Sequence, residues 1–213
     1  MKNDPKNDPR REPERDPETE KQQRVLAAAK AVFLRYGFRR VTMQDIADEA
    51  GISRPALYLV FPNKEEVFKA AVLQLTNENL ALIRAGLPRL TSVRSKLAHA
   101  FELWTVYPFE IMLKSPDARD LVECGQGFAH ETLAQTAAQF EAILVEILAP
   151  LKAPAKSIGL STPQIAHLLA TSVHGFKEPA ASVDELRALI DGLLKLTLSA
   201  LSGSPVQRAN SES

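Results

Sequence analysis

The residues best suited to chemistry in this chain lie between Arg54 and Lys64, and the chemistry is recognition of bases and phosphates. Arg54 can donate two parallel hydrogen bonds to the O6 and N7 atoms of a guanine, and Ala56 is small enough to pack against a thymine methyl group. The Tyr58 hydroxyl and the Lys64 ammonium can donate to phosphate oxygens. Each of these residues taken alone is more typical of an ordinary surface, so the elements that carry them decide the interpretation.

Those elements read as two short helices joined by a tight turn, within the segment VTMQDIADEAGISRPALYLVFPNK (41–64). Thr42 is a good N-cap, and Asp45 three positions later suits a capping box. Gly51 can adopt the positive φ that a sharp turn after a helix requires, and Ser53 is a second N-cap. Two short helices joined by a turn with glycine are typical of a helix-turn-helix, whose second helix enters the major groove of DNA.

The same segment resembles the N-terminal domain of tetracycline-repressor-type (TetR) regulators. The resembling stretches are RVLAAAKAVFLRYGF (24–38), TMQDIADEAGISRPALYLVFPNK (42–64) and the EEVF that follows. The resemblance implies a homodimer that binds operator DNA with this domain and a small-molecule effector with the rest of the chain. Carried over by position, recognition-helix contacts fall on Arg54, Pro55, Ala56 and Tyr58, and phosphate contacts fall on Thr42, Ser53 and Lys64. Leu59 and Val60 depart from the family pattern, in which these positions often hold a larger aromatic or polar residue.

Composition indicates an all-helical protein of one or two domains. The chain has 213 residues, 45% of them hydrophobic, with alanine and leucine prominent. Its single cysteine, Cys124, excludes an internal disulfide and fits a reducing cytoplasm. No apolar run is long enough to span a membrane, and the polar N-terminus does not suit a secretory signal.

Charge is unevenly distributed along a chain whose formal net charge is zero. Residues 1–20 carry five basic and seven acidic side chains, whereas residues 21–67 carry eight basic and five acidic ones. The excess positive charge therefore lies on the segment with the helix-turn-helix, as expected of a DNA-binding surface.

Apolar residues recur at helical spacing through most of the chain, with proline and glycine as breaks. Ser161 with Gln164, and Ser182 with Glu185, suit two further capping boxes. We expect a linker at 149–160, a loop at Gly125 and Gly127, and helices at 18–36, 63–85, 92–107, 109–113, 115–123, 128–148, 162–177 and 183–201. The predicted organisation is a disordered charged tail (1–19), a helix-turn-helix domain (20–67), an effector-binding and dimerisation domain (68–203) and a frayed C-terminus (204–213).

The last two predicted helices, 162–177 and 183–201, are apolar over a wide arc, so each must be covered on two sides. One cover is the domain itself, and the simplest second cover is another copy of the chain, in a four-helix bundle across a two-fold axis. A deeply buried core within one monomer is the alternative.

An effector pocket is the most plausible small-molecule site, because pockets between bundle helices are mostly apolar with few polar groups. These residues suit an apolar ligand, although each would serve equally well as ordinary core. The candidate lining residues are Phe101, Trp104, Tyr107, Met112, Phe128 and His174.

Catalytic and metal-binding patterns are missing from the sequence. His130 and Glu131 begin like a zinc-protease motif, but Ala134 stands where the second histidine must be. There is no Cys-x-x-Cys pair and no glycine-rich phosphate loop, and Cys124 suits a structural thiol. We therefore expect a protein that is not an enzyme and that needs no metal or cofactor.

These observations favour a cytoplasmic, dimeric transcriptional repressor, released from a palindromic operator DNA by a small, largely apolar effector. In such a dimer two recognition helices enter successive major grooves. A helical enzyme or carrier with a purely structural helix-turn-helix, and a DNA-binding regulator without an effector, are the alternatives.

Overall fold

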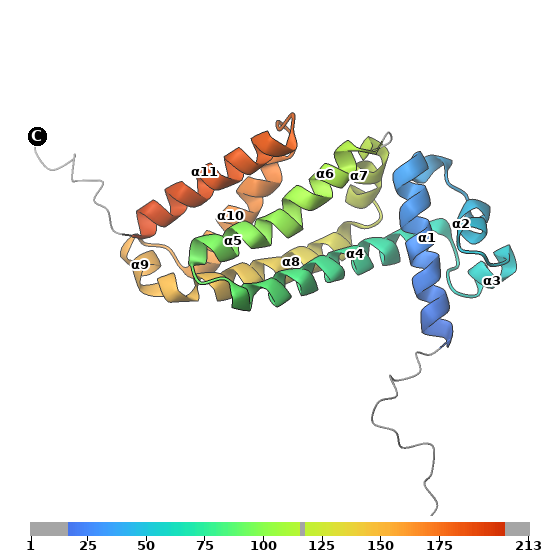
Figure 1. The fold of residues 1–213 in the computed structure, drawn as a ribbon, viewed down its shortest axis with the longest axis horizontal. Helices are drawn as coiled ribbons and strands as arrows, with labels where there is room; N and C mark the ends of the chain where they lie inside the picture. Colours follow the sequence, from blue (N-terminus) through green and yellow to red (C-terminus); the bar gives the residue numbers. More distant parts are fainter. Residues whose placement is uncertain (1–16, 116–117, 203–213) are drawn as a thin grey trace, which may run out of the picture.

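The computed structural model describes residues 17–115 and 118–202, and all the regular structure in these ranges is helical, which confirms the predicted all-α fold. The molecule is elongated, with α1, α2 and α3 at one end and the long helices α4, α5, α8, α10 and α11 forming the body (Figure 1). The elements are α1 (Pro17–Arg40), α2 (Met43–Glu49), α3 (Arg54–Tyr58), α4 (Lys64–Gly86), η1 (Leu87–Arg89), α5 (Val93–Phe101), η2 (Glu102–Val106), α6 (Tyr107–Leu113), α7 (Ala118–Gln126), α8 (His130–Leu148), η3 (Ala149–Leu151), α9 (Lys152–Ser157), α10 (Thr162–Phe176) and α11 (Val183–Leu201).

Buried apolar side chains form two clusters, one at each end of α4. Phe68 of α4 belongs to the N-terminal cluster with residues of α1, α2 and α3, such as Ile46 and Leu57. Ile83, near the other end of α4, belongs to the C-terminal cluster with residues of α5, α8, α10 and α11. Helix α4 therefore joins the two ends of the molecule, as its predicted length implies.

The N-terminal cluster also receives residues from far along the chain. Leu121 of α7 and Ala129 are buried in it, and Phe128 packs against it from the turn between α7 and α8. The Phe128 ring lies 4.9 Å from that of Phe38 and 5.4 Å from that of Phe68. The hydrophobic core beneath the helix-turn-helix thus extends well beyond residue 67.

Helix N-termini follow the predicted capping residues closely. Thr42 and Ser161 each form a complete capping box, with Asp45 and Gln164 respectively as the reciprocal partners. Ser182 caps α11 by accepting from the Glu185 N–H at 3.1 Å.

The predicted second half of the Ser182 box is wrong. The Glu185 carboxylate reaches one residue further back and accepts from the Ala181 N–H at 2.9 Å. The cap on α11 is therefore made by the serine, while the glutamate fastens the preceding turn.

Glycine and proline disturb the helices less than the sequence predicts. Gly37 has φ +75°, which breaks the helical geometry as expected, yet helical turns continue to Arg40 beyond that kink. Gly125 lies within α7 rather than in a loop, and the predicted linker at 149–160 contains η3 and α9. The predicted helix start at Ser115 and Pro116 falls partly outside the described residues, and α8 begins at His130 rather than at Phe128.

Helices α5 and α6 form one continuous run through η2, a wide π-type turn before Pro108. The Tyr107 N–H donates to the Glu102 carbonyl, five residues back. Pro108 has no N–H to donate, and the wider turn lets the chain continue past it instead of ending there. The sequence predicted an interruption at this proline, whereas the structure has a bulged helix.

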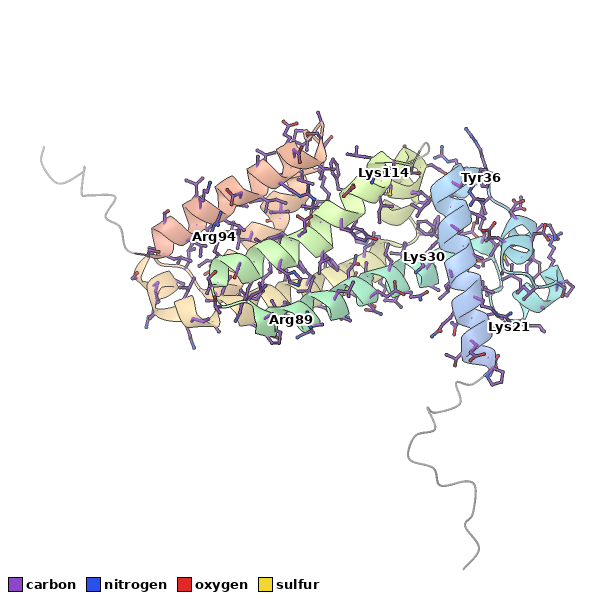
Figure 2. The ribbon with its side chains drawn as sticks, in the orientation of Figure 1. Lys21, Lys30, Tyr36, Arg89, Arg94 and Lys114 are labelled. Atoms are coloured by element: carbon purple, nitrogen blue, oxygen red, sulfur yellow. The ribbon has the colours of Figure 1, made fainter. Side chains whose placement is uncertain are left out.

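Ion pairs fasten α11 to α5 and η2. The Arg187 guanidinium donates to the Glu102 carboxylate at 2.6 Å. Arg94, which lies between α5 and α11 in Figure 2, donates to Asp191, and Asp191 also pairs with Lys195 at 2.7 Å. Among the described residues, no helix is both long and apolar enough to cross a membrane.

Candidate nucleic-acid interface

Helices α2 and α3 are held at a fixed angle by the turn between them. Gly51 adopts φ +65°, and the Ile52 N–H donates back to the Ala47 carbonyl at 3.0 Å. The Ile52 side chain packs against the N-terminal cluster, and Leu57 of α3 is fully buried in it. These contacts leave the opposite face of α3 free to meet a ligand.

The exposed face of α3 carries most of the predicted DNA contacts. Arg54, Pro55 and Tyr58 are exposed, and Ala56 is half-buried among them. Leu59 follows directly and is 83% exposed, the highest value among the large apolar side chains of the described chain. The structure therefore brings together the four predicted recognition-helix residues on one short helix.

Arg54 and Tyr58 contact each other across one helical turn. The Arg54 Nη2 atom donates to the Tyr58 hydroxyl at 3.3 Å, and its guanidinium carbon lies 5.5 Å from the centre of the tyrosine ring. The arginine is thus supported by a neutral aromatic group rather than by a carboxylate.

Thr42 and Ser53 are exposed at the starts of α2 and α3, where both side chains cap the helix. The Thr42 hydroxyl donates to the Asp45 carboxylate at 2.7 Å and accepts from the Asp45 N–H at 3.2 Å. The hydroxyl and the backbone N–H of Thr42, in that order, lower the pKa of Asp45. The phosphate contacts of Thr42 and Ser53 stay predictions, and both residues also stabilise the helices that they cap.

Lys64 occupies an unexpected place. Its ammonium donates to the carbonyls of Phe38 at 2.8 Å and Val41 at 2.7 Å, and it lies 4.2 Å from the centre of the Phe38 ring. A cation is favoured where helix carbonyls are left without intrahelical partners, as at the end of α1. The predicted phosphate contact of Lys64 stays a prediction, and the structure adds a clamp between α1 and α4 that sequence spacing does not reveal.

Several basic residues near the helix-turn-helix are paired with carboxylates. Arg39 contacts both Asp120 at 3.1 Å and Glu123 at 2.8 Å, two residues of α7. Lys30, labelled on α1 in Figure 2, lies 3.4 Å from Glu78 of α4. In each of these pairs a carboxylate offsets the positive charge, whereas the partner of Arg54 is the neutral Tyr58.

The six predicted effector-lining residues fall in three different environments. Phe101 is buried in the C-terminal cluster, and Trp104 stacks on Phe140 there, with ring centres 4.7 Å apart and planes 8° apart. Met112 and Phe128 pack against the N-terminal cluster instead, while Tyr107 and His174 are exposed. The structure therefore does not bring these six together around one cavity, and their role in effector binding stays a prediction.

Metal and thiol chemistry find little support in this structure. Within residues 17–115 and 118–202, no three His, Cys, Asp or Glu side chains are grouped so as to hold a metal ion. Burial raises the pKa of Cys124, and the charge of Asp120, whose carboxylate lies 3.9 Å from the sulfur, raises it further. Since thiolates are the reactive form, this cysteine suits a structural role.

Comparison with known proteins identifies the N-terminal domain. Residues 25–71 match the model of the family described as bacterial regulatory proteins, tetR family. Among individual proteins, the transcriptional activator FasR of Mycolicibacterium smegmatis is 39% identical over 84 residues, which cover 39% of this chain and 38% of FasR. Matches to the first three curated relatives cover only 18% to 38% of those proteins' own length.

Solved structures extend the likeness to the whole fold. A transcriptional regulator from Rhodococcus sp. RHA1 superimposes with a TM-score of 0.69 at 18% identity, over 86% of this chain and 99% of that one. FadR from Bacillus subtilis, solved with stearoyl-CoA, gives a TM-score of 0.58 at 18% identity over 84% and 98%. Over residues 25–71 the chain therefore carries the N-terminal domain of the tetR family of bacterial regulatory proteins, within a fold similar to those of solved transcriptional regulators.

Proposed function

We propose that this protein is a dimeric, sequence-specific transcriptional repressor that leaves its operator when a small, largely apolar effector binds. The observation that carries this proposal is the exposed surface of α3. Arg54 and Tyr58 are exposed there, Ala56 is half-buried between them, and Leu59 directly follows the helix, while Leu57 is buried beneath. This arrangement suits insertion of α3 into a major groove. The protein would act in the cytoplasm, on DNA.

A second copy of the chain would supply the second recognition helix, so that each half-site of a palindromic operator is bound by one copy. Helix α10 buries one apolar face in the C-terminal cluster and leaves Leu168 52% exposed, while α11 leaves Leu196 73% exposed. Another side of α11 is committed to ion pairs with α5 and η2. The exposed leucines are the surface that we assign to the dimer, as a four-helix bundle of α10 and α11 with their copies.

The effector would bind within the body of the molecule, near the stacked rings of Trp104 and Phe140. An apolar ligand could replace the stacking contacts that these rings make with each other. The stearoyl-CoA bound by FadR of Bacillus subtilis shows that this fold can hold a ligand with a long apolar chain in another protein. For release to follow, the effector must prefer the conformation that does not fit DNA.

Fluorescence anisotropy of the full chain tests this function directly. The probe is a labelled duplex from upstream of the protein's own gene, titrated over a salt series beside a scrambled duplex of equal length. Tight, salt-sensitive binding to the first duplex and far weaker binding to the second supports sequence-specific regulation. Equal and weak binding to both, followed by failure to enrich any sequence from random duplexes, would refute it.

Activation is the second candidate outcome of binding, because FasR, matched in the same domain, is named an activator. A reporter placed behind the bound DNA separates the two outcomes. Deletion of the regulator raises reporter expression if the protein represses, and lowers it if the protein activates.

A further inference from the structure

We infer that Tyr58 is a positioning residue for Arg54, and that the ring and hydroxyl of this tyrosine hold the guanidinium in the orientation that reads a guanine. This inference rests on the proposed function, since it concerns how the same surface selects its DNA sequence. The juxtaposition that carries it is the contact between the first and last residues of α3.

The geometry joins two kinds of contact in one pair. The Arg54 Nη2 atom donates to the Tyr58 hydroxyl at 3.3 Å, and the guanidinium lies over the ring, 5.5 Å from its centre. A guanidinium held by a hydrogen bond and by the face of an aromatic ring loses less conformational freedom on binding than a free side chain. The pair therefore prepares Arg54 for DNA before DNA arrives.

The stability of α3 does not explain an arginine at this position. Arg54 is the first residue of α3, where the partial positive charge of the helix terminus disfavours a cation. Several other arginines of the described chain contact carboxylates, as Arg39 contacts Asp120 and Arg187 contacts Glu102. A neutral partner leaves the charge of Arg54 uncancelled, so no carboxylate has to be displaced when the guanidinium meets DNA.

The hydrogen-bonding capacity of the pair also matches the task. Arginine has five N–H donors, and Tyr58 accepts from one guanidinium nitrogen, which leaves a pair of donors for the O6 and N7 atoms of guanine. The Tyr58 hydroxyl accepts from Arg54 and keeps its own proton, which it can donate to a phosphate oxygen. Tyr58 can thus contact Arg54 and a phosphate at the same time, which would fix the position of the arginine relative to the DNA backbone.

The test is selection of bound sequences from a pool of random duplexes by the full-length protein and four variants. Arg54→Ala removes the reading group, Tyr58→Leu removes ring and hydroxyl, and Tyr58→Phe removes the hydroxyl alone. Tyr36→Leu is the matched control, because Tyr36 is a similarly exposed tyrosine on α1 whose ring lies 5.6 Å from the Arg35 guanidinium (Figure 2). Thermal melting of each variant confirms that it is folded.

We expect the wild type to prefer guanine at one position of each half-site, and Arg54→Ala to lose that preference. Tyr58→Leu should lose roughly tenfold or more of the discrimination at the same position, although Arg54 is still present. Tyr58→Phe should keep an intermediate preference, and Tyr36→Leu should select the same sequences as the wild type. Substituting 7-deazaguanine at that position should weaken wild-type binding and leave Tyr58→Leu nearly unaffected, because N7 is the acceptor that a positioned arginine uses.

Other results would overturn the inference, and they differ from those that overturn the proposed function. If Tyr58→Leu weakens binding equally on all duplexes and keeps the guanine preference, Tyr58 is only a phosphate contact. The inference also fails if Tyr58→Leu behaves like the wild type. If the wild type enriches no sequence, the proposed function fails together with the inference.

Discussion

The two roles of Lys64 show how one residue can serve both a fold and a ligand. Sequence position makes its ammonium a candidate for phosphate, whereas the structure places it on the carbonyls of Phe38 and Val41 and against the Phe38 ring. Both roles draw on the same three N–H donors. A single substitution can therefore affect stability, DNA affinity or both, and the two readouts must be measured separately.

Lys64→Ala is expected to destabilise the protein by about 1–3 kcal/mol, because partly buried carbonyls at the end of α1 lose a charged donor. Urea unfolding followed by circular dichroism measures this change. Lys21→Ala, which removes a lysine from α1, is the control and should unfold like the wild type. A Lys64→Ala protein with unchanged stability, but with weaker binding to every duplex, would make phosphate contact its main role.

The carboxylate of Asp45 predicts a pH dependence. Hydrogen bonds from Thr42 lower its pKa in the folded state, so the carboxylate contributes stability above its ordinary pKa and loses that contribution as pH falls through the lowered value. The wild type should therefore melt at a higher temperature than Asp45→Asn near neutral pH. This difference should shrink in acid, below the range in which aspartate ordinarily titrates.

A difference in melting temperature that stays constant from neutral to acidic pH would contradict this account of Asp45. Asp48→Asn is a suitable control, because Asp48 lies one turn further along α2 and caps nothing.

At the scale of elements, α7 is one part of the second half of the chain that contacts the helix-turn-helix domain. The Asp120 carboxylate accepts from the backbone N–H of Arg39 at 2.7 Å and pairs with its side chain at 3.1 Å. The Ser115 hydroxyl, just before α7, donates to the Leu34 carbonyl at 2.8 Å. The end of α1 is thus fixed from two directions by groups some eighty residues away in the sequence.

Asp120→Ala should destabilise the protein more than Arg39→Ala. The Asp120 side chain is only 14% exposed, and its loss leaves a backbone N–H without its acceptor, at a cost of about 1–3 kcal/mol. Arg39→Ala removes an exposed side chain and keeps the backbone bond, so its effect should stay below about 1 kcal/mol. Equal losses for both variants in chemical unfolding would place the stabilisation in the ion pair instead.

The elements show which parts of the fold can be predicted from the sequence. Thr42, Ser53 and Ser161 were identifiable as caps because capping depends on residues three apart in the chain. The contacts of Lys64 and Phe128 depend on neighbours that are distant in sequence. The π-type turn before Pro108 depends on how a helix accommodates a residue without an N–H donor. No local pattern records these contacts.

The candidate site follows the same division. Arg54 and Tyr58, four residues apart, could be placed on one helix face from spacing alone, and their side chains meet there in the structure. The effector-lining residues were predicted from residue type rather than from proximity in space. In the structure some lie in the C-terminal cluster, some pack against the N-terminal cluster and some are exposed. Their distribution depends on the tertiary packing of the elements from α5 to α10, which helical periodicity does not determine.

For the whole molecule, the apolar surface of α10 and α11 predicts how the protein assembles. Leu168→Lys should weaken dimerisation by roughly 3 kcal/mol or more, because the charge would be buried without a partner at the two-fold interface. Analytical ultracentrifugation of this variant should then find monomers. Its binding to a duplex with two half-sites should weaken, because fewer dimers are present.

The matched control is Leu82→Lys, since Leu82 of α4 is 55% exposed and Leu168 is 52% exposed. This control should remain dimeric and bind DNA as the wild type does. If both lysine variants dimerise normally, the surface of α10 and α11 is not the interface.

The insertion of Phe128 and Ala129 into the N-terminal cluster has a consequence for building hybrid regulators. A hybrid made by exchanging the helix-turn-helix domain between relatives would be cut most simply where α4 begins. In this protein, a graft of residues 17–67 would lack Phe128 and Ala129, which form part of the core of that domain. A functional hybrid of this protein should therefore transfer α7 and the turn that follows it together with α1 to α3.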